Sequence, residues 1–385
     1  MRQAAGLAVL PSGAGGRRVA ASGVFWLALL VAIFLILPPG TPAPAQVGWG
    51  LALAAVLAIT VVVRANWLAI VALVGAGIGL RLAFVDVGVS DVLTVTAAAI
   101  ERALAGGNPY GVGYGVSRPP GSPFPYGPLA LLWYLPFRAN PLAVELAVSS
   151  LIVVLLGLRG RPLGLAIFAA APVLFTTAGD GSNDNSAGLL LLIALLATRR
   201  SVLVGAVLLG LATAFKPYAA AWIPPLLAWG RLPAAAGLAG GLAALWVPAL
   251  LAWGPGPIVA SIVRSQEIHR QPFYSLAAVV ESITRRSVDP QAFDQLRLVF
   301  GAAAALVTFP LARTWTRVVL AGAAIYLATL FLGYWSTFAY LTALAPICCW
   351  QLDDWLGVGQ RRVRWPADPA GRLSTWLDRR APPRP

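Results

Sequence analysis

The cationic side chains that could bind an anion stand in two short stretches of this chain. Lys216, in FKPYA, is its only lysine, and His269 is its only histidine, between Glu267 and Arg270 in QEIHR. Ammonium, guanidinium and imidazolium groups donate strong charge-assisted hydrogen bonds to phosphate oxygens. We therefore consider an anion pocket of Lys216, Arg264, His269 and Arg270, with ordinary membrane-boundary positions as the alternative interpretation of the lysine and the histidine.

The candidate carboxylates stand in two other stretches. Asp91 opens SDVLTVTAAAIERALAGG, and Asp180, Asn183 and Asp184 belong to GDGSNDNS. Each stretch also has a structural interpretation. Asp91 could cap the helix that follows it, and the second stretch could form a polar turn. Both interpretations stay open at the level of the sequence.

Several familiar motifs are absent from the sequence. It contains no G-x-x-x-x-G-K-[ST] phosphate-binding loop, and the glycines of GVGYG do not stand between a strand and a helix. A single histidine without a spaced cysteine cluster argues against a zinc site. We therefore expect neither a metal ion nor a cofactor.

The composition indicates that these residues are positioned by membrane-spanning helices. The chain is 59% hydrophobic and 11% charged, whereas soluble domains carry roughly 25% charged residues. We predict an all-α polytopic membrane protein, because apolar stretches of about 17–25 residues can cross a bilayer. The predicted spans, about twelve in number, lie near residues 23–38, 47–63, 66–85, 141–158, 162–178, 187–198, 201–216, 217–229, 232–252, 295–312, 318–334 and 336–352.

Arginines in the short turns predict the orientation of the chain. With the N-terminal segment 1–22 in the cytoplasm, the short turns on that side contain no carboxylate and collect arginine, as the positive-inside rule requires. The basic tail, 353–385, joins them and is expected to be largely disordered, resting on anionic lipid. This topology explains the net charge of +14 without a nucleic-acid partner. The turns contain Arg64, Arg159, Arg161, Arg199, Arg200, Arg231, Arg313 and Arg317.

The extracytoplasmic side collects the acidic residues. The predicted outer loops are 86–140, 179–186 and 253–294, and ten of the fourteen carboxylates lie in them or at their edges. Carboxylates at a membrane boundary are costly unless they are paired or hydrated, which indicates a site on this side. The first loop should contain a short helix at LALLWYLPF and an amphipathic surface helix with the apolar face Leu93, Ala97, Ile100 and Leu104.

Five stretches, in this order, carry a family resemblance: SDVLTVTAAAIERALAGGNPY, FPYGPLALLWYLP, GDGSNDNSAGLLLL, LLGLATAFKPYAAAWIPPLL and VRSQEIHRQPFYS. They resemble the GT-C superfamily of polytopic glycosyltransferases, and above all glycosyltransferase family 87 (the DUF2029 proteins), which are bacterial mannosyl- and arabinosyltransferases. The catalytic subunit of GPI mannosyltransferase I is a more distant likeness. The similarity covers roughly residues 86–280 and lies in the order and spacing of the stretches.

The resemblance implies an inverting transferase that moves a sugar, mannose before arabinose, from a polyprenyl phosphate to a lipid or glycan acceptor. The site would face the outside of the bacterial plasma membrane. Asp91 matches the general base, with Asp86 as second choice, and His269 and Arg270 match the motif that faces the donor phosphate. Lys216 is predicted to join them. The predicted substrate-binding residues are Asp86, Asn108, Tyr110, Tyr126, Asp180, Asn183, Asp184 and Glu267.

A polytopic transporter or lipid flippase is the alternative prediction, and a non-catalytic membrane scaffold is the third. Transporters place their sites near the bilayer midplane, on broken helices related by an internal repeat. This sequence shows no repeat between its halves, and its ionisable residues gather at one side. We therefore favour the transferase.

Overall fold

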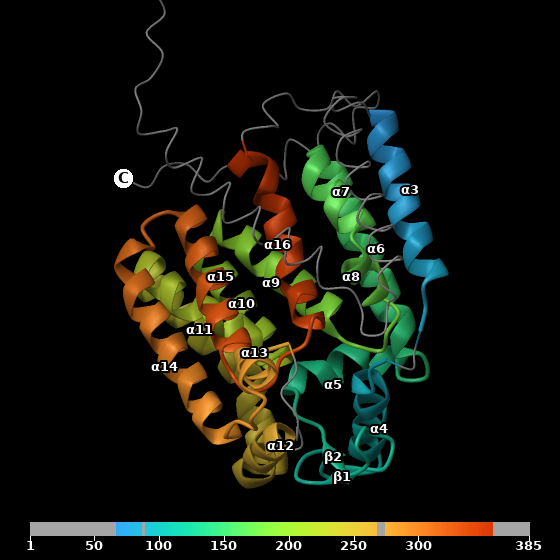
Figure 1. The fold of residues 1–385 in the computed structure, drawn as a ribbon, viewed down its shortest axis with the longest axis vertical. Helices are drawn as coiled ribbons and strands as arrows, with labels where there is room; N and C mark the ends of the chain where they lie inside the picture. The colour runs from blue at the N-terminus through green and yellow to red at the C-terminus, as the bar shows by residue number, and fades with distance from the viewer. Residues whose placement is uncertain (1–66, 87–88, 268–273, 357–385) are drawn as a thin grey trace, which may run out of the picture.

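The computed structural model describes residues 67–86, 89–267 and 274–356, and Figure 1 shows a bundle of helices with one short hairpin. The hairpin pairs β1 (Gly113–Tyr114) with β2 (Ser122–Pro123) in antiparallel register. The helical fold class is thus confirmed for the described part of the chain. The helices are α3 (Trp67–Ala83), α4 (Val92–Leu104), α5 (Pro128–Tyr134), η1 (Leu135–Phe137), α6 (Pro141–Arg159), α7 (Pro162–Ala170), α8 (Pro172–Thr176), α9 (Asp184–Thr198), α10 (Val202–Phe215), η2 (Pro217–Trp222), α11 (Ile223–Trp253), α12 (Pro255–Glu267), α13 (Leu276–Thr284), α14 (Pro290–Thr308), η3 (Phe309–Leu311), α15 (Trp315–Phe331) and α16 (Ala339–Leu356).

Local signals set the boundaries of the helices, as α6 illustrates. α6 begins at Pro141, behind Asn140, whose side chain accepts a hydrogen bond of 3.2 Å from Ala143 N. Proline suits a first helical turn because its missing N–H would have no helical partner there. α6 ends at Arg159 and is followed by Gly160, which has φ +72°, a left-handed conformation that glycine adopts at little cost.

Among the described residues, three helices are long and apolar enough to cross a membrane. By length and composition they are Pro141–Arg159, Pro217–Trp253 and Pro290–Leu311. Shorter apolar helices accompany them at Trp67–Ala83, Pro128–Phe137, Asp184–Thr198, Val202–Phe215 and Trp315–Phe331. Twelve spans are therefore not confirmed. Those predicted at 23–38 and 47–63 lie outside the described residues, as does 357–385 of the tail. The predicted span 162–178 is interrupted at Ala171, because Pro172 cannot continue a helix.

α11 contains a reversal of the chain at Arg231. That residue has φ 50° and ψ −133°, far from helical values. Before it, Gly230 packs against Val202 at the start of α10, and after it Gly241 packs against Val207. The first part of α11 is therefore antiparallel to α10. The chain reverses at Arg231, and the second part of α11 is parallel to α10. The predicted break between two spans coincides with this turn.

Arg81 holds α3 to its neighbours although it is completely buried. Its Nε donates to the Ser149 hydroxyl at 2.7 Å, and its Nη2 donates to the Phe168 carbonyl at 2.7 Å. Its Nη1 donates to Gly77 O at 2.8 Å. The partners of this buried charge are a hydroxyl of α6 and carbonyls of α3 and α7, and the sequence analysis assigned it no role.

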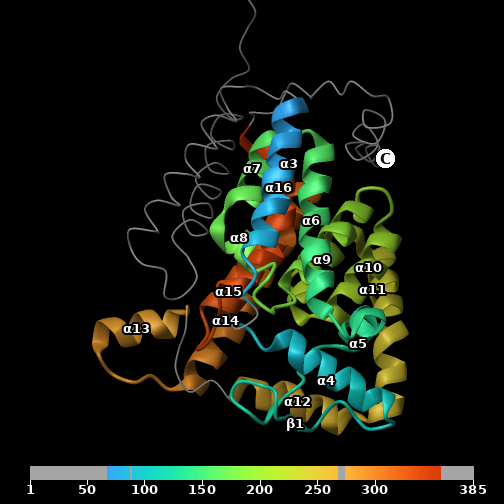
Figure 2. The ribbon, with the colours of Figure 1, turned by 90° about the vertical axis from the view of Figure 1, so that its right-hand side faces the viewer.

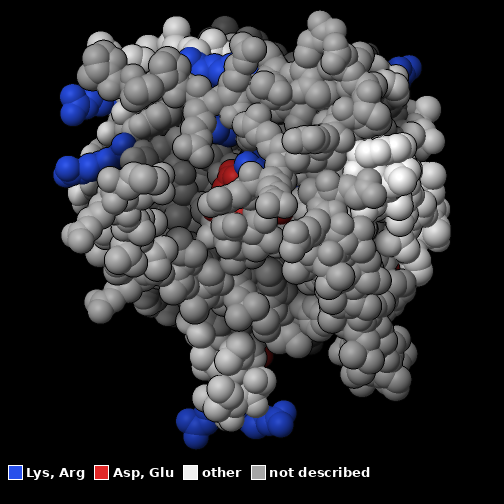
Figure 3. Space-filling view, turned by 90° about the horizontal axis from the view of Figure 1, so that it is seen from above, with Lys and Arg blue, Asp and Glu red and all other residues white. Residues whose placement is uncertain are grey.

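The two ends of the bundle differ in character. Figures 1 and 2 show α4, α5, α12 and the hairpin together at the lower end. These elements come from the predicted outer loops 86–140 and 253–294. At the other end, where α6 leads into α7, Arg159 and Arg161 form ion pairs with Asp354 at 2.6 and 2.9 Å. Figure 3 views that upper end, with basic and acidic side chains near its middle. The predicted outer elements therefore share one end of the fold.

Candidate functional site

Two segments of the predicted outer loops run side by side at the base of the bundle. Gly181, between α8 and α9, has φ +91°, and a Cβ there would overlap the Ser90 carbonyl oxygen. Glycine therefore permits this close approach. The close approach of Gly181 to Ser90 places Asp91 beside the start of α9. Backbone N–H groups of the first segment donate to carbonyls of the second at 2.8 to 3.0 Å: Ser90 to Asp180, Asp86 to Gly179, and Leu93 to Gly181.

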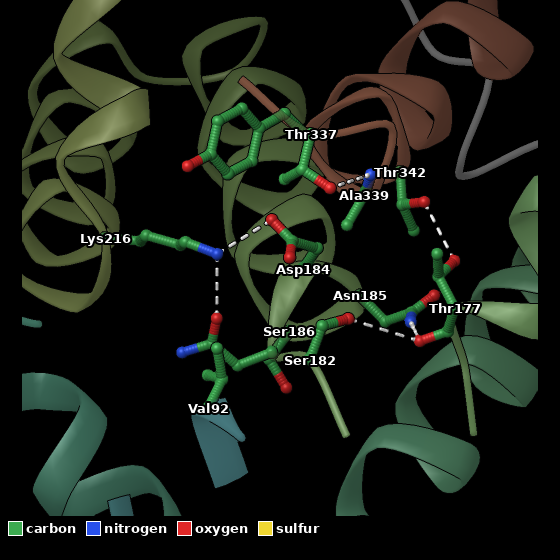
Figure 4. Close-up of polar contacts among 12 residues, drawn as sticks. Val92, Thr177, Ser182, Asp184, Asn185, Ser186, Lys216, Thr337, Ala339 and Thr342 are labelled. Carbon is green, nitrogen blue, oxygen red and sulfur yellow. Dashed lines mark hydrogen bonds and ion pairs between the residues drawn. The ribbon is translucent and has the colours of Figure 1, made fainter. Parts of the chain in front are cut away.

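Lys216 is buried where α10 ends, and its ammonium binds the start of α9. Nζ donates to Asn183 Oδ1 and to Asp184 Oδ1, both at 2.8 Å. Figure 4 shows the side chain of Lys216 pointing to Asp184. The side chains of this ion pair are each 3% exposed. Removing one partner of such a pair leaves a buried charge uncompensated. The structure thus brings together three predicted site residues from two separate stretches of the sequence.

Three tyrosine rings surround the Lys216 ammonium. Nζ lies 5.4 Å from the ring centroid of Tyr126, 4.6 Å from that of Tyr218 and 5.7 Å from that of Tyr340. These distances are in the range of cation–π attraction. Tyr126 reaches this position because the next residue donates its N–H to the carbonyl of Phe215, at the end of α10. The sequence analysis named Tyr126 and missed the other two, which follow no motif.

Asp91 stands at the N-cap position of α4, but its side chain does not cap the helix. Its Oδ2 instead accepts a hydrogen bond of 2.6 Å from Arg118 N, in the turn between β1 and β2. Burial raises the pKa of the Tyr126 hydroxyl, and the neighbouring Tyr340, Asp184 and Asp91 raise it further. The carboxylate of Asp91 and the buried ion pair therefore share Tyr126 as a neighbour.

Glu145 is a buried carboxylate that the sequence analysis counted only as a loop-edge residue. Its oxygens accept hydrogen bonds from the Tyr134 hydroxyl at 2.5 Å, from Ser186 N at 3.2 Å and from the Ser186 hydroxyl. Trp133 Nε1 donates to the same hydroxyl at 3.0 Å. This cluster joins α5 and α6 to the first turn of α9. It therefore holds the helix end that binds Lys216.

Asp180 is buried, and its side chain stabilises the turn between α8 and α9. Its Oδ1 accepts a hydrogen bond of 2.7 Å from Ser182 N, which is the usual way in which aspartate closes a local turn. Burial raises the pKa of Asp180 to about 7, although the hydrogen bonds from Ser182 lower it. In the folded protein, this carboxyl group therefore binds a proton more tightly than an exposed aspartate does.

We expect Asp180 to make the stability of the protein fall as the pH rises. An unfolded aspartate has a pKa of about 3.9, and the folded value is about 7, so folding favours the protonated form. The stabilisation is full below about pH 4 and is lost as the pH rises through about 7. Asp180→Asn should flatten this slope, because its amide oxygen still accepts from Ser182 N. Thermal unfolding in detergent between about pH 4 and 7 measures this pH dependence of stability. Equal slopes in the unchanged protein and in Asp180→Asn would contradict the raised pKa of Asp180.

Asn108 and Tyr110 shape the first loop rather than facing the buried ion pair. Asn108 Nδ2 donates to Trp253 O at 2.8 Å, and its Oδ1 accepts from Tyr110 N at 2.9 Å. The Tyr110 hydroxyl donates to Tyr126 O at 3.0 Å. These contacts tie the stretch NPY to the end of α11. Asp86, the second choice for the base, is exposed and precedes α4.

Three predicted site residues fall outside the described part of the chain: the side chain of Glu267, His269 and Arg270. Their role stays a prediction. Tyr274 is the first described residue after these positions, and its ring centroid lies 5.8 Å from that of Phe338. Ser275 donates from its hydroxyl to Tyr334 O at 2.5 Å. The loop between α15 and α16 leads into Tyr340, whose ring lies near the Lys216 ammonium, so this loop borders the site.

Comparisons with known proteins give no match to this chain among family models, curated proteins or solved structures. Within the described residues, no group of three or more His, Cys, Asp or Glu side chains could hold a metal ion. The candidate site is therefore defined by its geometry: a partly exposed Asp91 beside the buried Lys216–Asp184 pair.

Proposed function

We propose that this protein is an inverting glycosyltransferase of the membrane that takes its sugar from a polyprenyl phosphate. The position of Asp91 carries the proposal. Its carboxylate is partly exposed, does not cap α4, and is oriented by the N–H of Arg118. A general base needs a fixed position and an oxygen within reach of the proton that it accepts. Asp91 has these properties at the end of the bundle formed by the predicted outer segments.

The proposed reaction is a single displacement at the anomeric carbon of the donor sugar. The acceptor hydroxyl oxygen forms a bond to that carbon while Asp91 takes its proton. The bond from the carbon to the phosphate oxygen breaks, and the polyprenyl phosphate leaves with the electron pair as a stable anion. Cationic donors favour this departure, and His269 with Arg270 are the predicted ones. Mannose is the first sugar to test, with a lipid or glycan as acceptor.

Lys216 has a different part in this proposal from the phosphate contact that the sequence predicts. Its ammonium binds Asn183 and Asp184 in a buried place. The adjoining residues 179–181 hold the segment that contains Asp91 through three backbone hydrogen bonds. Lys216 is therefore a positioning residue, which keeps the base in place without touching the substrate.

Membrane surroundings for this site are supported by the outer surface of α14. This helix belongs to one of the candidate spans, only 6% of which is buried in the protein. Its exposed side chains include Leu298, Leu306 and Val307, which are 68%, 76% and 66% exposed. Apolar surface of this extent is stable in lipid and costly in water.

A transporter is the second candidate, favoured by one observation. The Lys216–Asp184 pair is buried among helices, and paired charges within a membrane bundle often belong to a transport pathway. Asp91 argues for the transferase, because its carboxylate is partly exposed and is held by Arg118 N in the turn between β1 and β2.

The proposal is tested with the purified full-length protein in nanodiscs. Labelled polyprenyl-phosphate mannose and a membrane lipid extract are added, and chromatography follows the appearance of a new labelled glycolipid. We expect product with the unchanged protein and none with Asp91→Asn. Polyprenyl-phosphate arabinose is the second donor. Absence of product from both donors, together with substrate flux in proteoliposomes, would favour the transporter.

We also expect opposite labelling of the two ends of the bundle in intact cells. Gly115, exposed near β1, and Arg313, exposed before α15, are suitable positions for single cysteines. The native Cys348 and Cys349 are buried and should not react. An impermeant thiol reagent should label the cysteine at 115 and not the one at 313. The reverse result would place the site in the cytoplasm and remove an outer-leaflet donor from the proposal.

A further inference from the structure

The segment from α13 to the start of α14, residues 276–289, forms an arm that stands away from the bundle. Figure 2 shows α13 projecting sideways and lying across the direction of the long helices. Its first turn is attached to the body by the hydrogen bond from Ser275 to Tyr334 O. Beyond that turn, most of the arm is exposed. We name this segment the α13 arm.

The α13 arm combines exposed apolar side chains with exposed positive charge. Val279 and Ile283, four residues apart on one face of the helix, are 52% and 76% exposed. Arg285 and Arg286 follow directly and are both exposed. Figure 3, seen from above, shows basic side chains at the tip of a projection from the body. This combination is typical of helices that lie in the interface between a bilayer and water.

The two acidic side chains of the arm accept hydrogen bonds from backbone N–H groups. Glu281 Oε1 accepts a hydrogen bond of 3.0 Å from Val288 N, and Asp289 Oδ1 accepts one of 3.0 Å from Gln291 N at the start of α14. The ion pairs of the described chain do not include Arg285 or Arg286. Both guanidinium groups are therefore available to an anion outside the protein.

The position of the two arginines along the chain identifies the source of that anion. α14, part of a candidate membrane span, begins at Pro290, four residues after Arg286. A group so close to the start of a span lies at the depth of the lipid headgroups. Two adjacent, exposed arginines at this depth lie where the phosphate groups of anionic lipids are within reach as partners.

We propose that the α13 arm rests on the outer leaflet and binds anionic phospholipid through Arg285 and Arg286, while Val279 and Ile283 enter the headgroup boundary. Guanidinium binds phosphate in a bidentate manner, and the apolar pair adds attraction that does not depend on lipid charge. The inference needs α14 to span the membrane with Pro290 at the outer side, and it is independent of the proposed transferase activity.

The test uses the full-length protein in nanodiscs of phosphatidylcholine, with and without phosphatidylglycerol. An environment-sensitive fluorophore is attached to Ile283→Cys, and the matched control is Gly115→Cys, which is exposed at the same end of the fold. We expect brominated lipid to quench the probe at 283 and not that at 115. Phosphatidylglycerol should shift the emission of the 283 probe to the blue. In Arg285→Gln/Arg286→Gln, the phosphatidylglycerol content needed for half of that shift should rise on the order of tenfold.

Two results would overturn the proposal. A probe at 283 that brominated lipid does not quench would mean that the arm faces water or another protein. Quenching that is the same with and without phosphatidylglycerol, and in the double arginine variant, would mean that the arm enters lipid without recognising its charge. Circular dichroism and the elution volume of each variant verify that the protein is folded when these results are compared.

Discussion

Asp91→Asn should lower the rate of sugar transfer by about 10²–10⁴-fold, the usual contribution of a positioned general base. The amide has nearly the same size, and its oxygen can still accept the hydrogen bond from Arg118 N. The helix start should not suffer, because the side chain of Asp91 does not cap α4. The variant should therefore be folded and inactive. Initial rates at saturating donor and acceptor, normalised to folded protein, measure the effect.

Asp86→Asn is the matched control for this experiment. Asp86 is an exposed aspartate of the same segment, and its backbone N–H, which donates to Gly179 O, is unchanged by the substitution. We expect its rate to stay within about twofold of the unchanged protein, as an exposed position away from the chemistry should. Loss of activity in Asp86→Asn with normal activity in Asp91→Asn would exchange the two roles.

Lys216→Met should lower kcat on the order of 10²-fold, because a small displacement of a catalytic group costs about that much. The affinity for the donor should change little, since the ammonium binds Asn183 and Asp184 within the protein. A direct phosphate contact would instead raise the donor KM. Initial rates against donor concentration separate the two roles. A raised donor KM at unchanged kcat would contradict the positioning role and restore the phosphate contact that the sequence predicts.

The stability of the same variants provides an independent measurement. Lys216→Met leaves Asp184 buried without its partner, which should cost about 3–5 kcal/mol, whereas Lys216→Met/Asp184→Leu should recover most of that loss. The double variant should be folded yet slow, which separates positioning from simple instability. Arg138→Met is the control, because the Arg138–Glu101 pair is 48% and 62% exposed and should contribute at most about 1 kcal/mol. Chemical denaturation in detergent measures these differences.

Helical periodicity and apolar content predicted the helical class of the fold, whereas the predicted number of spans is not confirmed. The amphipathic helix after Asp91 is present as α4, but Leu93 and Ile100 of its predicted membrane-facing side are buried inside the protein, whereas Leu104 at the end of that face is 55% exposed. Hydropathy could not show the interruption at Ala171, because an apolar run looks the same on both sides of a proline. The reversal at Arg231 was predictable, since a charge interrupts two apolar runs there.

The candidate site was predictable where a residue type was rare. A single lysine in an arginine-rich chain drew attention to Lys216, and the cluster of polar residues in GDGSNDNS drew attention to Asp184. Glu145 could not be found in this way, because its role depends on a contact with Ser186, 41 residues later. The contact of Lys216 with Asp184 could not be predicted either, because residue types alone do not show whether a cation faces a substrate or a buried carboxylate.

The buried Arg81 has a consequence for the synthesis of this protein in the cell. Its acceptors on Ser149 and Phe168 lie 68 and 87 residues further along the chain. When α3 leaves the ribosome, those partners have not been made, and an arginine in the predicted span 66–85 would disfavour insertion by up to about 3.5 kcal/mol. We expect α3 to stay near the insertion machinery until α7 has emerged. Membrane integration should therefore not follow the order of the sequence, since an early helix becomes stable only when a later one arrives.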